Sequence, residues 1–295
     1  MIHGLQRPDD GRLVVVVGPT ASGKTELAIA LAEAWNGEVL SADSVQIYRG
    51  FDVGSGKPTQ GERARAPHHL IDVCAPDDPI DAARFVALAE ETLAEVRARG
   101  RTPIVCGGTY LWVKALVRGL APLPPKDTTL RARHDAIVRA DGRVALHARL
   151  AAVDPASAQR LAPNDVLRVS RALEIYELTG RPQSDHFAEH GFRTARHATL
   201  LLGVERDREE LDRRITERVR AWLQGGWLDE VRSLCAAGYG ETRAMGSVGY
   251  KQVREHLLGE LPLADLEGAI VRATRVFVRR QRTWLRNEPV TWLSP

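Results

Sequence analysis

Cysteine is scarce in this chain of 295 residues, and long apolar runs are absent. The three cysteines, Cys74, Cys106 and Cys235, stand far apart and form no C-x-x-C pair. This spacing excludes a disulfide framework and a zinc module, so we expect reduced thiols. No segment approaches the run of about 18 apolar residues that a membrane helix requires, and the first residues lack the features of a signal peptide. The sequence therefore predicts a cytoplasmic protein that does not associate with membranes.

Acidic residues are missing from residues 271–286, which carry six arginines. The rest of the chain holds 35 basic and 38 acidic residues, so the positive charge is concentrated in this one segment. Steps of three and four positions place five of the arginines on one side of a helix: Arg272, Arg275, Arg279, Arg282 and Arg286. A broader face of the same helix, which we expect to pack against the core, holds Ile270, Thr274, Phe277, Val278, Trp284 and Leu285. Solvated helices usually mix acids with bases, so this cationic side favours nucleic-acid phosphates as its partner over a plain solvated surface.

A glycine-rich octapeptide, GPTASGKT, follows the apolar run 13–17 and precedes an amphipathic stretch. Strand, loop and helix in this order are the context of a phosphate-binding P-loop. Glycines let the backbone amides turn towards one anion, a lysine adds charge, and the following helix contributes its dipole. Thr25 is predicted to ligate Mg²⁺, the expected cofactor. We expect a diphosphate or nucleotide to bind to Gly18, Pro19, Thr20, Ala21, Ser22, Gly23, Lys24 and Thr25.

Strand and helix patterns alternate along much of the chain. Strands are predicted at 13–17, 38–42, 102–106 and 198–204, and helices lie between them. This alternation predicts an α/β fold, a P-loop NTPase-like parallel sheet flanked by helices. Prolines 122, 124 and 125 precede a helically patterned stretch, so we assign 120–196 to a helical insertion domain and 1–119 with 197–295 to the core. Ligands bind at the carboxyl ends of parallel strands, so Lys24, Asp43 and Thr109 are expected to converge.

Seven strings in the sequence resemble, in order and over nearly the whole chain, the bacterial type of the tRNA dimethylallyltransferase (IPP transferase) family. They are GPTASGKT, SADSVQIYRG, HHLID, GGT followed by KAL, NDVLRVSRALEIYELTGRP, SVGYK and RRQRTWLR. SADSVQIYRG and RQRTWLR carry most of the specificity. The chain departs from the family pattern at Tyr110, Trp112, Val166, Leu167 and Gly246.

The resemblance implies transfer of a dimethylallyl group from dimethylallyl diphosphate to N6 of adenosine 37 in tRNA, next to the anticodon, with release of diphosphate. Asp43 would take the N6 proton, and Lys24 would neutralise the leaving group. Thr109 would contact the region of the target nucleotide. A helix cap or turn is the competing interpretation of Asp43, and an N-cap that of Thr109. His68 and His69 are expected to be structural.

The resemblance also implies a contact surface for the anticodon stem-loop of tRNA. Some of these residues follow the predicted strands, some lie in the insertion, and the rest lie near the carboxyl end. They are Asp43, Ser44, Val45, Gln46, Thr109, Arg131, Leu167, Arg168, Val169, Ser170, Arg171, Gly246, Ser247, Val248, Gly249, Tyr250, Lys251, Arg279, Arg280, Gln281, Arg282, Thr283, Trp284, Leu285 and Arg286.

Three other functions compete with this one. An enzyme that prenylates free adenine nucleotides would share the P-loop and the carboxylate, but would have little use for the insertion or the arginine helix. An ATP-dependent small-molecule kinase leaves SADSVQIYRG unexplained. A nucleic-acid-binding module with a vestigial nucleotide site predicts RNA binding without turnover. No heptad repeat is visible, so we expect a monomer.

Overall fold

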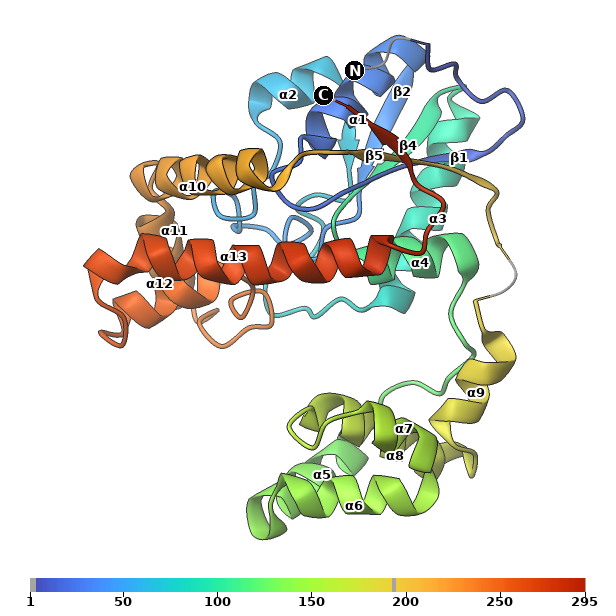
Figure 1. Ribbon diagram of the computed structural model, residues 1–295, viewed down its shortest axis with the longest axis vertical. Helices are drawn as coiled ribbons and strands as arrows, with labels where there is room; N and C mark the ends of the chain where they lie inside the picture. Colours follow the sequence, from blue (N-terminus) through green and yellow to red (C-terminus); the bar gives the residue numbers. More distant parts are fainter. Residues whose placement is uncertain (1–3, 193–194, 295) are drawn as a thin grey trace. The chain divides into compact units, whose positions relative to one another are not determined.

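The computed structural model describes residues 4–192 and 195–294, and the chain divides into two compact units (Figure 1). One unit, the core, comprises the segments up to Val117 and from Arg196 onwards. The other, the insertion, is Arg118–Ala195. The boundaries expected from sequence, 119/120 and 196/197, lie within two residues of these.

A parallel sheet of six strands forms the centre of the core, in the order β3-β2-β4-β1-β5-β6. Its strands are β1 Leu13–Val17, β2 Gly37–Ser41, β3 His68–His69, β4 Thr102–Cys106, β5 Thr199–Val204 and β6 Thr291–Leu293. In register, Val15 of β1 pairs with Val105 of β4 and Leu201 of β5. All residues of β1 are buried, as expected for a strand whose two faces are both covered by helices. The predicted α/β class with a parallel P-loop-like sheet is confirmed.

Helices cover the sheet and extend from it. They are α1 Lys24–Trp35, α2 Gln60–Arg65, α3 Ala82–Ala98, α4 Tyr110–Arg118, α10 Arg208–Gln224, α11 Trp227–Ala236, α12 Tyr250–Leu257 and α13 Leu263–Leu285. Helix α1 begins directly after the P-loop and buries Leu27, Ala28 and Leu31 in the cluster that contains Val14 and Val39 of the sheet. This packing fixes the first turn of α1, with its free amides, at the carboxyl end of β1. Helices α10 and α13 pack against each other.

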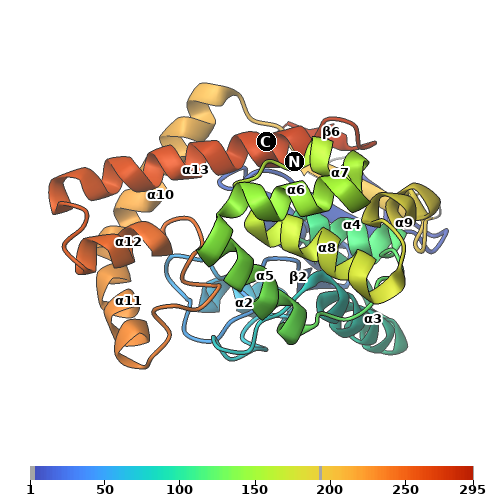
Figure 2. The same ribbon diagram turned by 90° about the horizontal axis from the view of Figure 1, so that it is seen from below.

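The insertion contains only helices among its described residues. They are α5 Thr128–Asp141, α6 Arg143–Val153, α7 Pro155–Arg160, α8 Val166–Thr179 and α9 Gln183–His190, and Figure 2 shows them from below. Leu146, Leu150, Val169 and Leu173 form a separate apolar cluster. The insertion therefore has a hydrophobic core of its own.

Helix α13 packs differently from the expectation. Phe277 and Trp284, which were expected on the packed face, are 37% and 49% exposed. The buried stripe is Leu266, Ile270, Val271, Thr274, Val278, Gln281 and Leu285. A residue one position from the stripe is rotated by about 100°, which turns both aromatic side chains towards solvent. The stripe also includes a buried amide, Gln281, which the apolar pattern did not predict.

No helix in the described parts of the chain is both long and apolar enough to span a membrane.

Candidate active site

The P-loop has the strained backbone that its glycines permit. Gly18 and Gly23 adopt φ angles of 152° and 98°, and Ala21 adopts 66°, so the loop departs three times from the usual backbone region. A Cβ on Gly18 would lie 2.8 Å from the hydroxyl of Ser22. The loop ends at Lys24, the first residue of α1. The loop amides and the positive end of the helix dipole therefore both favour an anion at the start of α1.

Lys24 reaches into a cavity together with Asp43. The lysine stays partly accessible, yet the surrounding protein lowers its pKa, because burial disfavours the ammonium more than the carboxylate of Asp43 favours it. Burial also raises the pKa of the Cys106 thiol to about 11, so this cysteine lines the cavity as a neutral thiol. An ammonium that burial disfavours in this way gains from an anionic ligand.

Asp43 lies two residues after the end of β2, and one of its carboxylate oxygens stabilises the turn that follows. Its Oδ1 accepts hydrogen bonds from the amides of Val45 at 2.9 Å and Gln46 at 3.3 Å. Among the described residues no hydrogen bond to Oδ2 is present, and the side chain lines the cavity. The turn interpretation is therefore correct for one oxygen, while the second oxygen belongs to a side chain that lines the cavity and has no hydrogen bond among the described residues.

Thr109 links the ends of two neighbouring strands. Its Oγ1 accepts from the amide of Ser44 at 2.9 Å and donates to the hydroxyl of Ser44 at 3.2 Å. A Cβ on Gly107 would lie 2.2 Å from the carbonyl oxygen of Ala42, so the two strand ends touch through a glycine. The predicted trio is therefore gathered at the carboxyl edge of the sheet, with Thr109 attached to the residue that follows Asp43.

Two cavities meet at this edge. The first, of about 60 Å³, is lined by Thr20, Lys24, Thr25, Val39, Ser41, Asp43, Gln46, Ser55, Gly56, Pro58, His68, Cys106, Gly107 and Arg218. The second, of about 470 Å³, shares Lys24, Thr25 and Arg218 with it. The P-loop lysine thus borders both spaces.

Arginines associated with α10 brace the P-loop, and the sequence analysis missed them. Arg206, just before α10, donates to the carbonyl of Ser22 at 2.7 Å, and Arg214 donates to that of Ala21 at 2.8 Å. Arg218 donates to the hydroxyl of Thr20. From the sequence, the i,i+4 spacing of Arg214 and Arg218 shows only that they share one side of α10, and it does not identify the P-loop as their partner.

Arg218 is the most distinctive of these arginines. Its guanidinium lies 4.6 Å from the ring centre of Trp222, and its Nε is buried without a hydrogen-bond partner in the described residues. Burial, followed by the neighbouring charge of Arg214, lowers the pKa of Arg218 to about 10. It remains a cation at neutral pH, so an unsatisfied buried donor and a positive charge face the same cavity.

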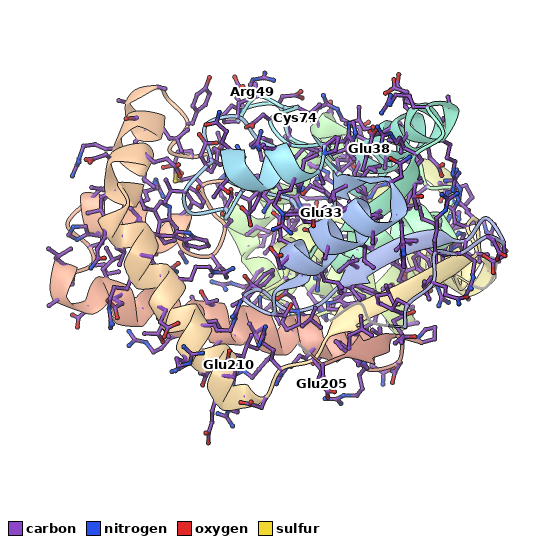
Figure 3. The ribbon with its side chains drawn as sticks, turned by 90° about the horizontal axis from the view of Figure 1, so that it is seen from above. Glu33, Glu38, Arg49, Cys74, Glu205 and Glu210 are labelled. Carbon is purple, nitrogen blue, oxygen red and sulfur yellow. The ribbon has the colours of Figure 1, made fainter. Side chains whose placement is uncertain are left out.

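Two other carboxylates of the core, Glu38 and Glu210, are already paired with cations. Glu38 and Glu210 are labelled in Figure 3. Glu38 accepts from Arg99 and His69, each at 2.7 Å, and the Arg99 hydrogen bond lowers its pKa. Glu210 pairs with Arg213 at 2.6 Å. Asp43 is thus the carboxylate of this edge that lines the cavity without an ion pair among the described residues.

The two histidines have the structural partners expected of them. His69 binds Glu38, and Nδ1 of His68 lies 2.8 Å from the carbonyl oxygen of Ala66. The Nε2 atom of His68 is buried and unpartnered among the described residues, and this side chain lines the first cavity. The described residues contain no group of three or more acids, histidines or cysteines that would hold a metal.

Oxygen donors near the P-loop fit a Mg²⁺ ion that is held mainly by its substrate. Thr25 and Asp43 line the same cavity. Mg²⁺ usually takes one or two protein oxygens together with water and phosphate oxygens, and this donor set matches that habit.

Helix α13 presents its arginines to solvent, including Arg279, Arg280 and Arg286. Arg275 binds Asp212 of α10 at 3.2 Å, and Arg282 donates to the carbonyl of Arg206 at 2.9 Å. A groove of about 520 Å³ between α10 and α13 is lined by Arg208, Leu211, Asp212, Arg272, Arg275, Val276, Val278, Arg279 and Arg282. One acid among five arginines makes this groove strongly cationic.

Several residues of the predicted RNA surface have other partners or are inaccessible. Arg131 and Arg171 both bind Glu174, whose side chain is fully buried. Leu167 and Arg168 are exposed at the start of α8. The side chains of Val169, Ser170, Tyr250, Gln281 and Leu285 are buried, so RNA would meet at most the backbone there.

The remaining predicted RNA residues lie in the core. Gln46 uses its amide to bind the carbonyls of Ser55 and Gly56, so it shapes the loop beside the first cavity. In the segment 246–251, Val248 and Lys251 are exposed, while Tyr250 opens α12 and donates to Glu230 at 2.5 Å. Thr283 and Trp284 are exposed beside the arginines of α13.

Together, fold and site define a P-loop-like α/β protein with a cavity lined by Lys24, Asp43 and Arg218 at the carboxyl edge of its sheet. The IPP transferase family model matches residues 46–288. The tRNA dimethylallyltransferase of Sorangium cellulosum (strain So ce56) is 68% identical over 287 residues, which cover 97% of this chain and 91% of that protein. The tRNA dimethylallyltransferase of Anaeromyxobacter dehalogenans (strain 2CP-C) is 52% identical over 288 residues, 96% of this chain and 95% of that protein. The chain belongs to the IPP transferase family, and it is a transferase.

Solved structures are similar over the same extent. The full-length tRNA isopentenylpyrophosphate transferase of Bacillus halodurans is 36% identical, with a TM-score of 0.71, and the alignment covers 97% of this chain and 90% of that one. A eukaryotic dimethylallyltransferase acting on tRNA is 27% identical, with a TM-score of 0.80, and the alignment covers 96% of this chain and 73% of that one.

Proposed function

We propose that this protein transfers a dimethylallyl group from dimethylallyl diphosphate to N6 of adenosine 37 in tRNA. The products are N6-(dimethylallyl)adenosine and diphosphate. The names of its relatives support the reaction, since proteins 68% and 52% identical to it are tRNA dimethylallyltransferases. The observation that carries the proposal is the position of Asp43, with one oxygen free of hydrogen bonds to the described residues, in a cavity that also contains Lys24 and Arg218.

The chemistry follows from these charges. N6 attacks the allylic carbon, the carbon–oxygen bond to diphosphate breaks, and the leaving group takes the electron pair. Adenine N6 is a weak nucleophile because its lone pair is delocalised, so Oδ2 of Asp43 accepts its proton during attack. Lys24, Arg218 and the P-loop amides stabilise the charge that develops on diphosphate.

Mg²⁺ is the proposed cofactor, held by the hydroxyl of Thr25 and by oxygens of the diphosphate. Bound there, the ion would neutralise charge on the leaving group. Residues of the protein position the groups near this ion. Thr109 binds the backbone amide of Ser44, after Asp43, and Arg206 and Arg214 bind carbonyls of the P-loop.

The two cavities support an arrangement with two substrates. Diphosphate fits the P-loop end, and adenine would leave its base stack to reach Asp43, as in enzymes that flip bases. Exposed arginines of α13 and the exposed start of α8 provide phosphate contacts for the anticodon stem-loop. A tRNA substrate implies action in the cytoplasm, and one site in each chain agrees with a monomer.

Prenylation of free adenine nucleotides is the nearest alternative, because it would use the same P-loop and carboxylate. The arginines of α13 favour RNA over a mononucleotide, since a mononucleotide offers too few phosphates to occupy them.

The decisive experiment is incubation of the purified protein with unmodified tRNA, Mg²⁺ and radiolabelled dimethylallyl diphosphate. AMP serves as the second acceptor, and Asp43→Ala serves as the control variant. We expect label in tRNA at adenosine 37, and a steep loss of label in the variant. Label in AMP alone would instead identify a nucleotide-prenylating enzyme. Absence of transfer to both acceptors would contradict the proposal and favour a kinase.

A further inference from the structure

Gln281 lies on the buried stripe of α13, where the neighbouring positions are apolar or bonded within the helix. Its Oε1 accepts from the amide of Thr20 in the P-loop at 2.9 Å, and its Nε2 donates to the carbonyl of Gly108 at 3.0 Å. The side chain is 5% exposed. A Cβ on Gly108 would lie 2.5 Å from Nε2, so the loop after β4 approaches this amide as closely as a glycine permits.

The chemistry of the two partners fixes the orientation of the amide. A backbone N–H only donates and a carbonyl only accepts, so the side chain between them must both accept and donate. A primary amide of this length satisfies both, whereas an ionised carboxylate would satisfy Thr20 and repel the Gly108 oxygen.

Both partners of Gln281 lie next to residues of the candidate active site. Thr20 carries the hydroxyl that binds Arg218, and Gly108 precedes Thr109, which holds the amide of Ser44 beside Asp43. Gln281 therefore bridges the segment that holds the diphosphate and the segment that positions the carboxylate. It does so from the helix whose exposed arginines, Arg280 and Arg282, flank it.

We propose that Gln281 is a positioning residue. It holds the P-loop in place relative to the segments after β2 and β4 that contain Asp43 and Thr109. The inference rests on the proposed function, because transfer requires the proton acceptor, Asp43, and the diphosphate leaving group to be held at a fixed distance and orientation. The role belongs to the amide and not to the bulk of the side chain.

The test compares Gln281→Met, which keeps length and burial but removes both hydrogen bonds, with Thr274→Val. Thr274 lies on the same buried stripe and bonds only to Ile270 of its own helix. At saturating substrates, we expect Gln281→Met to slow the single-turnover transfer to tRNA about 100-fold, the loss typical of a reacting group misplaced by about 1 Å. We expect its tRNA affinity to change less than about threefold, and Thr274→Val to stay near wild type.

Gln281→Glu separates positioning from packing. A protonated carboxylic acid both donates and accepts, so the ratio of variant to wild-type rate should rise as the pH falls and the buried carboxyl takes a proton. A ratio that is flat with pH contradicts the inference, because a role in packing alone would not respond to the proton.

A further measurement does not depend on the reaction. Hydrogen exchange of the Thr20 amide should be faster in Gln281→Met than in wild type or Thr274→Val, and affinity for inorganic diphosphate should fall. Unchanged exchange, unchanged diphosphate affinity, or transfer within threefold of wild type would each overturn the inference. If the wild type transfers nothing to tRNA, the proposed function fails, and exchange and diphosphate binding still decide the role of Gln281.

Discussion

At the scale of single residues, Asp43 combines a structural and a proposed chemical function in one carboxylate. Oδ1 accepts from the amides of Val45 and Gln46, and Oδ2 is free of hydrogen bonds among the described residues. Asparagine preserves an acceptor for the turn and removes the base, so the two functions are separable by substitution.

We therefore expect Asp43→Asn to lower kcat for transfer to tRNA by about 10²–10⁴-fold while the melting temperature stays close to wild type. Asp43→Ala should lose both activity and some stability, because it also leaves the two amides without their acceptor. Steady-state kinetics and thermal denaturation of both variants measure the two effects. A wild-type kcat in the Asp43→Asn variant would show that Asp43 is not the base that accepts the N6 proton.

Arg218 lines the cavity beside the P-loop, its pKa is lowered to about 10 and its buried Nε has no partner among the described residues, which are features of a residue that binds an anion. Arg218→Lys keeps the charge but loses the planar fork. We expect kcat to fall about 100-fold with KM for tRNA nearly unchanged, since the loss of one oxyanion donor typically lowers kcat by that factor. Arg232→Lys, on the exposed face of α11, is the control. An unchanged kcat would speak against a diphosphate ligand.

At the scale of elements, α8 is held to α5 by a buried carboxylate. Glu174 accepts from Arg131 and Arg171, and also from the amide of Asp127 at 2.5 Å. Burial alone would raise the pKa of Glu174, but these hydrogen bonds outweigh it and lower the pKa to about 2. Two of the arginines that the family resemblance assigns to RNA, Arg131 and Arg171, are therefore also structural in this chain.

Because the pKa of Glu174 is lowered on folding, its stabilising effect is complete above the unfolded value of about 4.5 and is lost as the pH falls towards about 2. We expect Glu174→Gln to lower the free energy of unfolding at pH 7 by about 3 kcal/mol, since it removes the buried charge that pairs with two partly buried arginines. Glu189→Gln breaks a solvent-exposed pair with Arg181 and should leave the free energy of unfolding close to that of the wild type. Urea titrations of the full chain at several pH values measure this, and equal effects of the two substitutions would refute it.

The packing of α13 also belongs to this scale. Phe277 and Trp284 are large and apolar, so their sequence positions suggested burial. The helix instead buries the narrower stripe that ends in Val278, Gln281 and Leu285. Tertiary packing selected which of two adjacent apolar faces meets the core, and amphipathic periodicity alone does not distinguish them.

At the scale of the whole molecule, the net charge of +3 conceals a cationic helix on an otherwise slightly acidic chain. If α13 binds RNA phosphates, Arg279→Gln combined with Arg280→Gln should reduce the salt dependence of tRNA affinity, with the slope of log Kd against log salt falling by about 1.5. Arg97→Gln, on the exposed end of α3, should leave the slope unchanged. Filter binding between about 50 and 200 mM KCl tests this, and identical slopes in all three proteins would exclude phosphate contacts at α13.

The sequence by itself determined the α/β class, the P-loop and the carboxylate at the end of the second strand, because each depends on local patterns: apolar runs, glycines and the alternation of strand and helix. The short strands β3 and β6 left no such pattern, since they contain two and three residues. Only the tertiary structure decided that Arg206, Arg218 and Gln281 brace the P-loop, from 184, 198 and 261 positions along the chain. Local periodicity records which face of an element is buried, whereas the partner of a buried polar group is fixed only when distant segments pack together.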